Sequence, residues 1–184
     1  MAERGWRSCL WMAIALAACA NLAAGQPPDT AEQEPGYRLV LVRHAEKMRG
    51  PDPGLNETGR ARAQFLAHWL AEDAIQAIWT SDYKRTRQTA QALAERLSLD
   101  TRIYDPTDQQ ALVDLLRSEG TNALVVGHSN TLPELAGLLC GCPVPELSEA
   151  DYERGWQLVT AGGSTTLSEL DFRELWTDRT AISD

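Results

Sequence analysis

The chain has 184 residues, 43% hydrophobic and 23% charged, so it is long enough to bury one ordinary globular core and short for two. Its formal net charge of −9 argues against nucleic acid as a partner, because affinity for a phosphate backbone comes from clustered Lys and Arg. Positive charge is nevertheless concentrated in residues 38–87, which contain nine Lys and Arg and six Asp and Glu. Residues 88–184 contain six Lys and Arg and sixteen Asp and Glu.

Residues 1–18 have the pattern of an export signal. Arg4 and Arg7 precede the apolar run SCLWMAIALAA, whose 11 residues match the core of a signal peptide and are too few to span a bilayer. The alternative, a buried N-terminal helix, is disfavoured because the polar, Pro-rich stretch that follows would leave it tethered to nothing. We therefore expect export to the periplasm or cell envelope.

The apolar run ends in Leu16-Ala17-Ala18-Cys19, which resembles a bacterial lipobox. This pattern predicts that Cys19 is lipidated and becomes the mature N-terminus, so that the protein is anchored to a membrane surface. Ordinary cleavage near Ala20 or Ala24 is the alternative. Residues 19–36 contain three prolines and no apolar periodicity, which predicts a flexible tether before a single domain over 37–184.

Two further cysteines, Cys140 and Cys142, are separated by one glycine. In an oxidising compartment they either form a tight disulfide or remain as small apolar residues in a turn. A metal site needs more ligands than this segment supplies, and we expect no metal and no cofactor.

From residue 38 onward, short apolar runs alternate with helical patterns. Strands are predicted at 38–42, 75–81, 101–105 and 122–127, and helices at 59–73, 84–97, 107–120 and 131–141. Capping boxes are expected at Thr107…Gln110 and Thr131…Glu134, with Gly120 ending the third helix. The last runs, 156–160 and 164–172, are typical of a hairpin. The alternation predicts a three-layer α/β fold, with helices on both faces of a mostly parallel sheet.

Polar side chains stand directly after each predicted parallel strand. Arg43 and His44 follow the first strand, Arg85 follows the second, Asp105 ends the third, and His128 with Asn130 follows the fourth. Ligands of open α/β sheets bind beyond the carboxyl ends of the strands, so we expect these side chains to meet at one edge. The remaining histidine, His68, lies inside a predicted helix, and we assign it no role.

Two guanidinium and two imidazole groups suit a tetrahedral phosphate dianion, because arginine pairs with phosphate oxygens in bidentate fashion. The sequence has no Gly-rich phosphate loop and no carboxylate cluster of the kind that holds magnesium. It also shows no evident Ser–His–Asp or Cys–His pairing, so a histidine nitrogen is the natural nucleophile.

Three motifs resemble those of the histidine phosphatase superfamily, which has the phosphoglycerate-mutase-like fold. LVRHAEK resembles its arginine–histidine signature, TSDYKRTRQTA is similar to its second-arginine motif, and LVVGHSNT is similar to its second-histidine motif. The resemblance extends from about residue 38 to 172. The short segment after the third strand brings the chain closest to small members such as the phosphohistidine phosphatases.

The resemblance implies a metal-independent phosphatase acting on small-molecule or protein-borne phosphates. His44 would become phosphorylated, Arg43 and Arg85 would clamp the phosphoryl oxygens, and His128 and Asn130 would bind the transferring group. The general acid is the departure from the family pattern. Asp105 is the candidate, with Asp108 as the alternative in a first helical turn. Lys47 is a candidate outer phosphate contact or a solvated charge. A phosphotransferase or mutase, and a non-catalytic phosphate-binding protein, remain as alternative functions.

Overall fold

The structure, a computed structural model, describes residues 36–173. Six strands and four helices are present in this part of the chain. In chain order they are β1 (Tyr37–Arg43), α1 (Glu57–Trp69), β2 (Ala77–Ser81), α2 (Lys84–Leu97), β3 (Thr101–Tyr104), α3 (Gln109–Glu119), β4 (Ala123–Gly127), α4 (Leu132–Cys140), β5 (Arg154–Ala161) and β6 (Ser164–Asp171). The predicted signal peptide, the lipobox and nearly all of the tether lie outside the described residues.

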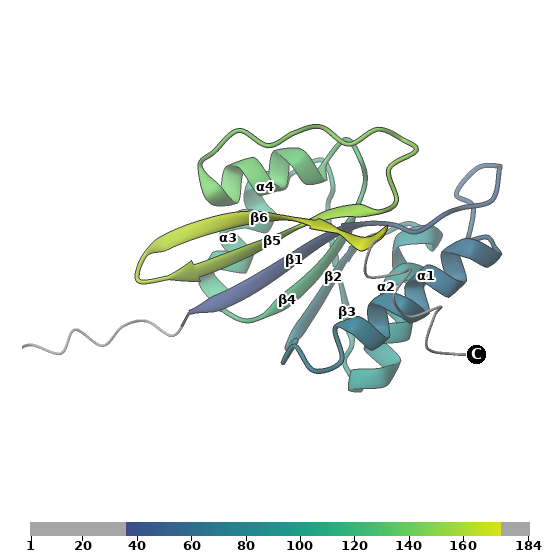
Figure 1. The fold of residues 1–184 in the computed structure, drawn as a ribbon, viewed down its shortest axis with the longest axis horizontal. Coiled ribbons are helices and arrows are strands. Elements are labelled where there is room, and N and C mark those ends of the chain that lie inside the picture. Colours follow the sequence, from purple (N-terminus) through teal and green to yellow (C-terminus); the bar gives the residue numbers. More distant parts are fainter. Residues whose placement is uncertain (1–35, 174–184) are drawn as a thin grey trace, which may run out of the picture. The chain divides into compact units, whose positions relative to one another are not determined.

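All six strands form one sheet in the order β3-β2-β4-β1-β5-β6 (Figure 1). The first four are parallel, while β5 runs antiparallel to β1, and β6 antiparallel to β5. The predicted mostly parallel sheet and its closing hairpin are thus confirmed. Each of the four predicted helices is present, although α1 begins two residues earlier and ends four residues earlier than its sequence pattern suggested.

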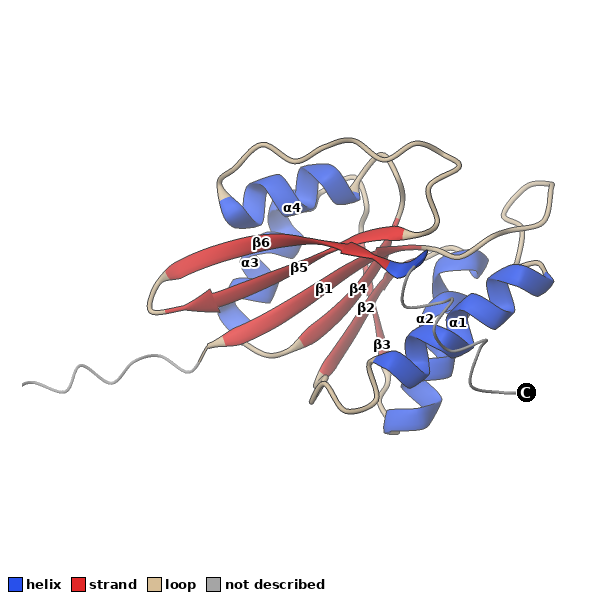
Figure 2. Ribbon diagram, in the orientation of Figure 1, coloured by secondary structure: helices blue, strands red, loops and turns tan. Residues whose placement is uncertain are grey.

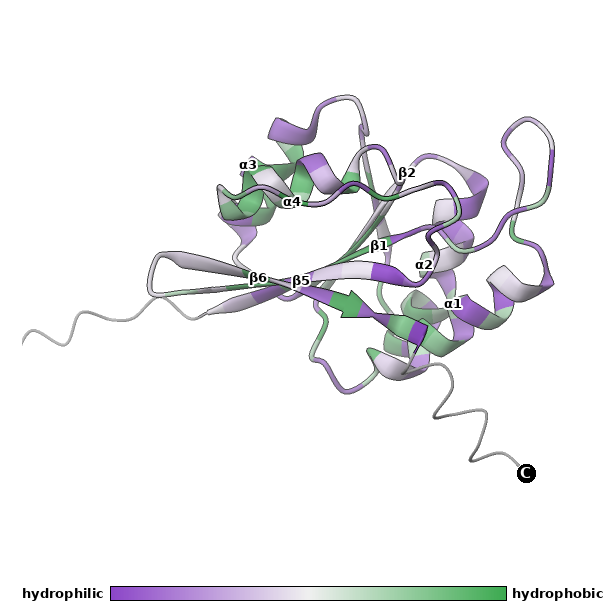
Figure 3. Cartoon of the chain, turned by 45° about the horizontal axis from the view of Figure 1, so that its top comes forward, coloured by the Kyte–Doolittle hydropathy of each residue, from purple (hydrophilic) through white to green (hydrophobic). Residues whose placement is uncertain are grey.

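Helices cover both faces of the sheet, with α1 and α2 on one side and α3 and α4 on the other (Figure 2). Alternate residues of β1 point to opposite faces: Leu39 and Leu41 pack with α3 and α4, whereas Val40 and Val42 pack with α1 and α2. Burial on both faces explains why this strand is apolar throughout. Figure 3 shows both apolar and polar residues along α3 and α4, as expected for helices with one face on the sheet.

The starts of α3 and α4 differ from the two capping boxes that the sequence predicted. Asp108, not Thr107, caps α3, because its side chain accepts a hydrogen bond from the Ala111 amide at 3.0 Å. Thr131 precedes α4 without capping it; its hydroxyl instead accepts from the His128 amide at 3.4 Å. Gly120 ends α3 in the left-handed conformation (φ 56°), as predicted.

Cys140 and Cys142 form a disulfide at the end of α4, so the structure takes the first of the two alternatives left by the sequence. None of the helices within residues 36–173 is long and apolar enough to cross a membrane.

The carboxyl ends of β2, β4 and β1 lie side by side, and this edge positions the candidate site. Arg43 is in register with Gly127, and the His44 amide donates to the Gly127 carbonyl at 2.9 Å. A Cβ at position 127 would lie 2.8 Å from both Leu132 and the Tyr104 hydroxyl, so only glycine fits here. The two strand ends therefore bring the segments that carry His44 and His128 together.

Candidate active site

His44 lies at the end of β1 and is buried, with a fractional exposure of 3%. Its Nδ1 is 2.8 Å from the carbonyl oxygen of Ala45, which can only accept, so Nδ1 carries the proton and Nε2 carries a free lone pair. Burial, followed by the charges of Arg43 and Arg85, lowers the pKa of His44 to about 3. The ring is therefore neutral near neutral pH, as a nucleophile must be.

His128 follows β4, and its ring meets that of His44 edge to face at a centroid distance of 5.5 Å. Arg85 Nη2 lies 3.4 Å from Nδ1, and Ser81 Oγ lies 2.8 Å from Nε2. Since arginine only donates, Nδ1 is the acceptor and Nε2 donates to Ser81. Burial, together with Arg85 and Arg43, lowers the pKa of His128 to about 4.

The hydrogen bonds of His128 continue through Ser81 to α2. The Ser81 hydroxyl donates to Thr86 Oγ1 at 3.2 Å, and Thr86 in turn donates to the Ser81 carbonyl at 2.7 Å. All three side chains are buried. The orientation of His128 is thus fixed by the junction of β2 and α2, a contact that the second-histidine motif alone does not reveal.

Arg85 lies in the first turn of α2 and contacts three groups. Besides His128, it lies over the Tyr83 ring, with its guanidinium carbon 4.3 Å from the ring centroid, and Nη1 is 3.8 Å from Asp52 Oδ1. Its Nε is buried and makes no hydrogen bond to the described part of the chain. Arg85 also lines a cavity of about 260 Å³, together with Tyr83, Pro106, Thr107, His128, Asn130 and Thr131.

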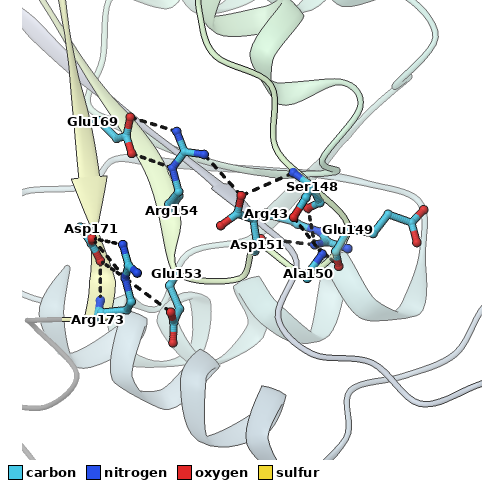
Figure 4. A network of polar contacts seen from close by, with 10 residues as sticks. All are labelled: Arg43, Ser148, Glu149, Ala150, Asp151, Glu153, Arg154, Glu169, Asp171 and Arg173. Atoms are coloured by element: carbon cyan, nitrogen blue, oxygen red, sulfur yellow. Dashed lines mark hydrogen bonds and ion pairs between the residues drawn. The ribbon is translucent and has the colours of Figure 1, made fainter.

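The Arg43 side chain makes several contacts with the protein that the sequence did not predict. Its Nη1 donates to the backbone carbonyls of Ser148, Glu149 and Asp151 at 3.1, 2.6 and 3.3 Å (Figure 4). The face of the guanidinium lies 4.2 Å from the centroid of the Tyr152 ring. Nε, in contrast, is buried without a hydrogen-bond partner among residues 36–173. One side of Arg43 is therefore committed to the 148–152 segment.

Tyr152 is the site residue that the sequence analysis missed. Besides stacking on Arg43, it faces His44, with 6.1 Å between the ring centroids. It precedes β5 by two residues, in a segment where nothing in the pattern indicates a site. The segment is held in place by Asp151, whose carboxylate pairs with Arg154 at 3.3 Å, and Arg154 pairs in turn with Glu169 on β6 (Figure 4).

Asp105, the predicted general acid, forms a turn. Its Oδ1 accepts from the Thr107 hydroxyl at 2.7 Å and amide at 2.8 Å, and these hydrogen bonds lower the pKa of the exposed carboxyl. Asp105 does not line the cavity, although Thr107 does. Asp108 caps α3. Within residues 36–173 no Asp or Glu is buried.

Of the other polar residues that the sequence analysis considered, one forms a partly buried ion pair with a helix and the rest are exposed to solvent. Glu46 binds Arg62 through both carboxylate oxygens, with a shortest distance of 2.7 Å, and joins the signature to α1. Lys47 is exposed and pairs through its backbone with Leu55. Asn130 is exposed at the rim of the cavity, and His68 is exposed on α1, away from the other two histidines.

Comparison with known proteins agrees with this geometry. The family model described as histidine phosphatase superfamily (branch 1) matches residues 39–106, which include Arg43, His44 and Arg85. Over these residues the chain is similar to the histidine phosphatase superfamily. The matched range ends before His128, which the fold itself brings to the other signature residues.

A curated member of similar sequence is phosphoserine phosphatase 1 of Hydrogenobacter thermophilus, 38% identical over 71 residues, which are 34% of this chain and 34% of that protein. The chain thus aligns with about a third of the length of that relative.

Solved structures extend the likeness of fold to nearly their whole length. The protein histidine phosphatase SixA complexed with tungstate superimposes with a TM-score of 0.62 and 18% identity, covering 75% of this chain and 99% of that one. The putative phosphohistidine phosphatase SixA from Agrobacterium tumefaciens gives a TM-score of 0.57 and 22% identity, covering 72% and 97%. The fold is therefore that of the small, phosphoglycerate-mutase-like members of the superfamily.

Proposed function

We propose that this chain is a metal-independent phosphatase that hydrolyses phosphomonoesters or phosphohistidine through a phosphohistidine on His44. One observation carries the proposal: His44 is held neutral, with Nδ1 bonded to the Ala45 carbonyl and the Nε2 lone pair free, beside two guanidinium groups. A neutral imidazole nitrogen next to an anion-binding pair is what in-line attack on phosphorus requires.

In the proposed first step, the Nε2 lone pair of His44 forms a bond to phosphorus while the bond from phosphorus to the leaving group breaks, which is P–O in an ester and P–N in a phosphohistidine. The leaving oxygen of an ester keeps that electron pair and takes a proton, whereas the leaving nitrogen keeps it as its ring lone pair. Arg43, together with Arg85, stabilises the charge on the equatorial oxygens. His128 lines the cavity, with Nε2 bonded to Ser81 and Nδ1 facing Arg85.

In the second step, water attacks phosphorus and the P–N bond breaks, which returns the electron pair to Nε2 and releases inorganic phosphate. The proton for the leaving oxygen in the first step was assigned to Asp105 by the sequence argument. The exposed, turn-forming carboxylate described above supports water at the cavity mouth as the donor instead. Substrates with good leaving groups, such as aryl phosphates and phosphohistidine, then depend least on protonation of the leaving group.

The test is hydrolysis of p-nitrophenyl phosphate in EDTA by the purified protein, beside His44→Ala and the matched control His68→Ala. We expect activity in the parent and in His68→Ala and none in His44→Ala, since His68 is an exposed histidine outside the site. Loss of one clamp arginine, as in Arg43→Ala, should cost roughly 10²–10³ in rate.

Equal background rates from the parent and His44→Ala would contradict the proposal for aryl esters, and inhibition by EDTA would contradict its metal independence. Faster turnover on addition of an alcohol would favour the phosphotransferase alternative. Phosphate binding without turnover would favour a non-catalytic binding protein.

A further inference from the structure

The first turn of α2 is electrostatically unusual. Basic residues occupy it at Lys84, Arg85 and Arg87, although the helix dipole makes this end positive already. The N-cap residue, Tyr83, supplies no side-chain hydrogen bond to the free amides. Asp82, two residues before the helix, pairs with Arg87, and a second negative charge near Lys84 and Arg85 would be favourable.

Asp52 supplies that negative charge. It lies in the loop between Lys47 and Leu55, whose ends pair in an antiparallel bridge and which projects beyond the sheet between β1 and α1 (Figure 1). Its Oδ1 accepts from the Lys84 amide at 3.0 Å and lies 3.8 Å from Arg85 Nη1. Asp52 has a φ of 42°, in the left-handed region that aspartate tolerates better than most residues.

The Asp52 carboxylate is thereby fixed beside Arg85, which lines the cavity together with His128. Arg85 joins the two, because one terminal nitrogen faces His128 while the other faces Asp52. The Asp52 side chain is 43% exposed, so a bound molecule can approach it. A second hollow, of about 550 Å³, shares Asn130 in its lining and includes Glu134, Glu146 and Glu149. Lys47 and Arg49 share the Asp52 loop, but both are exposed, and no hydrogen bond or ion pair joins their side chains to the described site residues.

We propose that Asp52 is a specificity residue, which disfavours substrates bearing a second negative charge near the reacting phosphate. The favoured class is phosphate bound to a neutral or cationic leaving group. The inference rests on the proposed phosphatase function and adds the substrate class. Like charges held near one another oppose binding, and Arg85 cannot give its full charge to a second anion while it faces Asp52.

The experiment compares the full chain with Asp52→Asn on three aryl phosphates: phenyl phosphate, its 3-carboxy derivative and its 3-trimethylammonio derivative. Asparagine keeps an oxygen that can accept from the Lys84 amide and removes only the charge. Released phosphate gives kcat/KM for each substrate, and each ratio to phenyl phosphate cancels leaving-group effects between the two proteins. Asp100→Asn, an exposed aspartate beyond the other end of α2, is the matched control.

We expect Asp52→Asn to raise the carboxy-to-phenyl ratio by roughly 1.5- to fivefold, the size of a screened interaction between partly exposed charges. The ammonio-to-phenyl ratio should fall, and Asp100→Asn should change neither ratio. If Asp52→Asn lowers kcat/KM for all three substrates by one common factor, Asp52 only positions Arg85 and the proposal is wrong.

Binding of phenylphosphonate and 3-carboxyphenylphosphonate, measured by calorimetry, separates this proposal from the proposed function. The P–C bond is not hydrolysed, so the measurement does not require turnover. A higher relative affinity for the carboxy compound in Asp52→Asn supports charge selection even if no phosphate ester is hydrolysed. An unchanged affinity ratio would contradict it even if the chain proves to be an active phosphatase.

Discussion

At the residue scale, the two buried histidines are distinguished by their hydrogen-bond partners. A backbone carbonyl fixes the proton of His44 on Nδ1, whereas an arginine and a serine fix the proton of His128 on Nε2. The motifs identified both residues, because histidine after a buried strand is a local signal. The tautomers, in contrast, depend on partners up to 47 positions away in the sequence. Tyr152 escaped prediction for the same reason, since its role depends on contacts with Arg43 and His44.

The first prediction concerns the charge state of these rings. With pKa values lowered to about 3 and about 4, both rings stay neutral in the folded protein as the pH falls from 7 to 5. In the unfolded chain they bind protons below about 6.5, so each ring lowers the free energy of unfolding by about 1.4 kcal/mol per pH unit below that value. NMR of the ring nitrogens should show unchanged tautomers to about pH 5. Titration of either ring near its ordinary value would contradict the burial argument.

The second prediction concerns Tyr152, which should act as a positioning residue for Arg43. Tyr152→Ala removes the ring beneath the guanidinium and should weaken phosphate binding and lower kcat/KM by roughly tenfold, since a partly buried cation–π contact is worth about 1–2 kcal/mol. Tyr152→Phe keeps the ring and should stay within about twofold of the parent. Calorimetry with inorganic phosphate and steady-state kinetics check the two variants. Equal losses in both would assign the effect to the hydroxyl group instead.

At the element scale, the site is held together by the contact between the end of β1 and α2. Thr89 on α2 accepts a hydrogen bond from the Ala45 amide at 2.9 Å and donates to the Arg85 carbonyl at 2.7 Å. On the other side, a Cβ at Gly59 of α1 would lie 2.1 Å from the Glu46 carbonyl oxygen. The signature segment is thus clamped between two helices. The periodicity of the sequence predicted both helices, whereas the side chains that join them to the strand became evident only from the structure.

The third prediction follows from Thr89. Thr89→Val keeps the shape of the side chain but leaves the buried Ala45 amide without a partner, which should cost about 1–3 kcal/mol of unfolding free energy. Activity should also fall, because this contact sets the distance between the segments of His44 and Arg85. Thr89→Ser restores the hydroxyl and should recover both properties, as measured by urea denaturation and hydrolysis. Full activity in the valine variant would mean that strand pairing alone positions His44.

At the scale of the whole molecule, the α/β alternation in the sequence predicted the layers, the mostly parallel sheet and the edge at which the site lies. This worked because strand and helix periods differ and because parallel strands place their carboxyl ends together. The capping boxes were wrong because a side chain that could cap has competing partners: Asp108 displaced Thr107, and Thr131 bonds back to His128. The 148–152 segment could not be predicted, since it contacts the site only through the fold.

The fourth prediction concerns the attachment of the chain to a membrane, which stays a proposal based on Leu16-Ala17-Ala18-Cys19. Expression in a bacterium fed a palmitate analogue should label the protein, and Cys19→Ala should abolish the label. Cys9→Ala, which changes a cysteine inside the predicted signal core, should leave labelling intact. A labelled Cys19→Ala variant, or an unlabelled parent released by cleavage near Ala20 or Ala24, would contradict the lipobox assignment.

The most direct test of the account is to trap the phosphorylated enzyme. Rapid mixing with a phosphoryl donor, denaturation in base and peptide mass spectrometry should find a single phosphoryl group on His44, stable in base and lost in acid. His44→Ala should carry none, and His68→Ala should carry as much as the parent. Phosphate found on Ser129 or another hydroxyl, or turnover that persists in His44→Ala, would contradict covalent catalysis by His44.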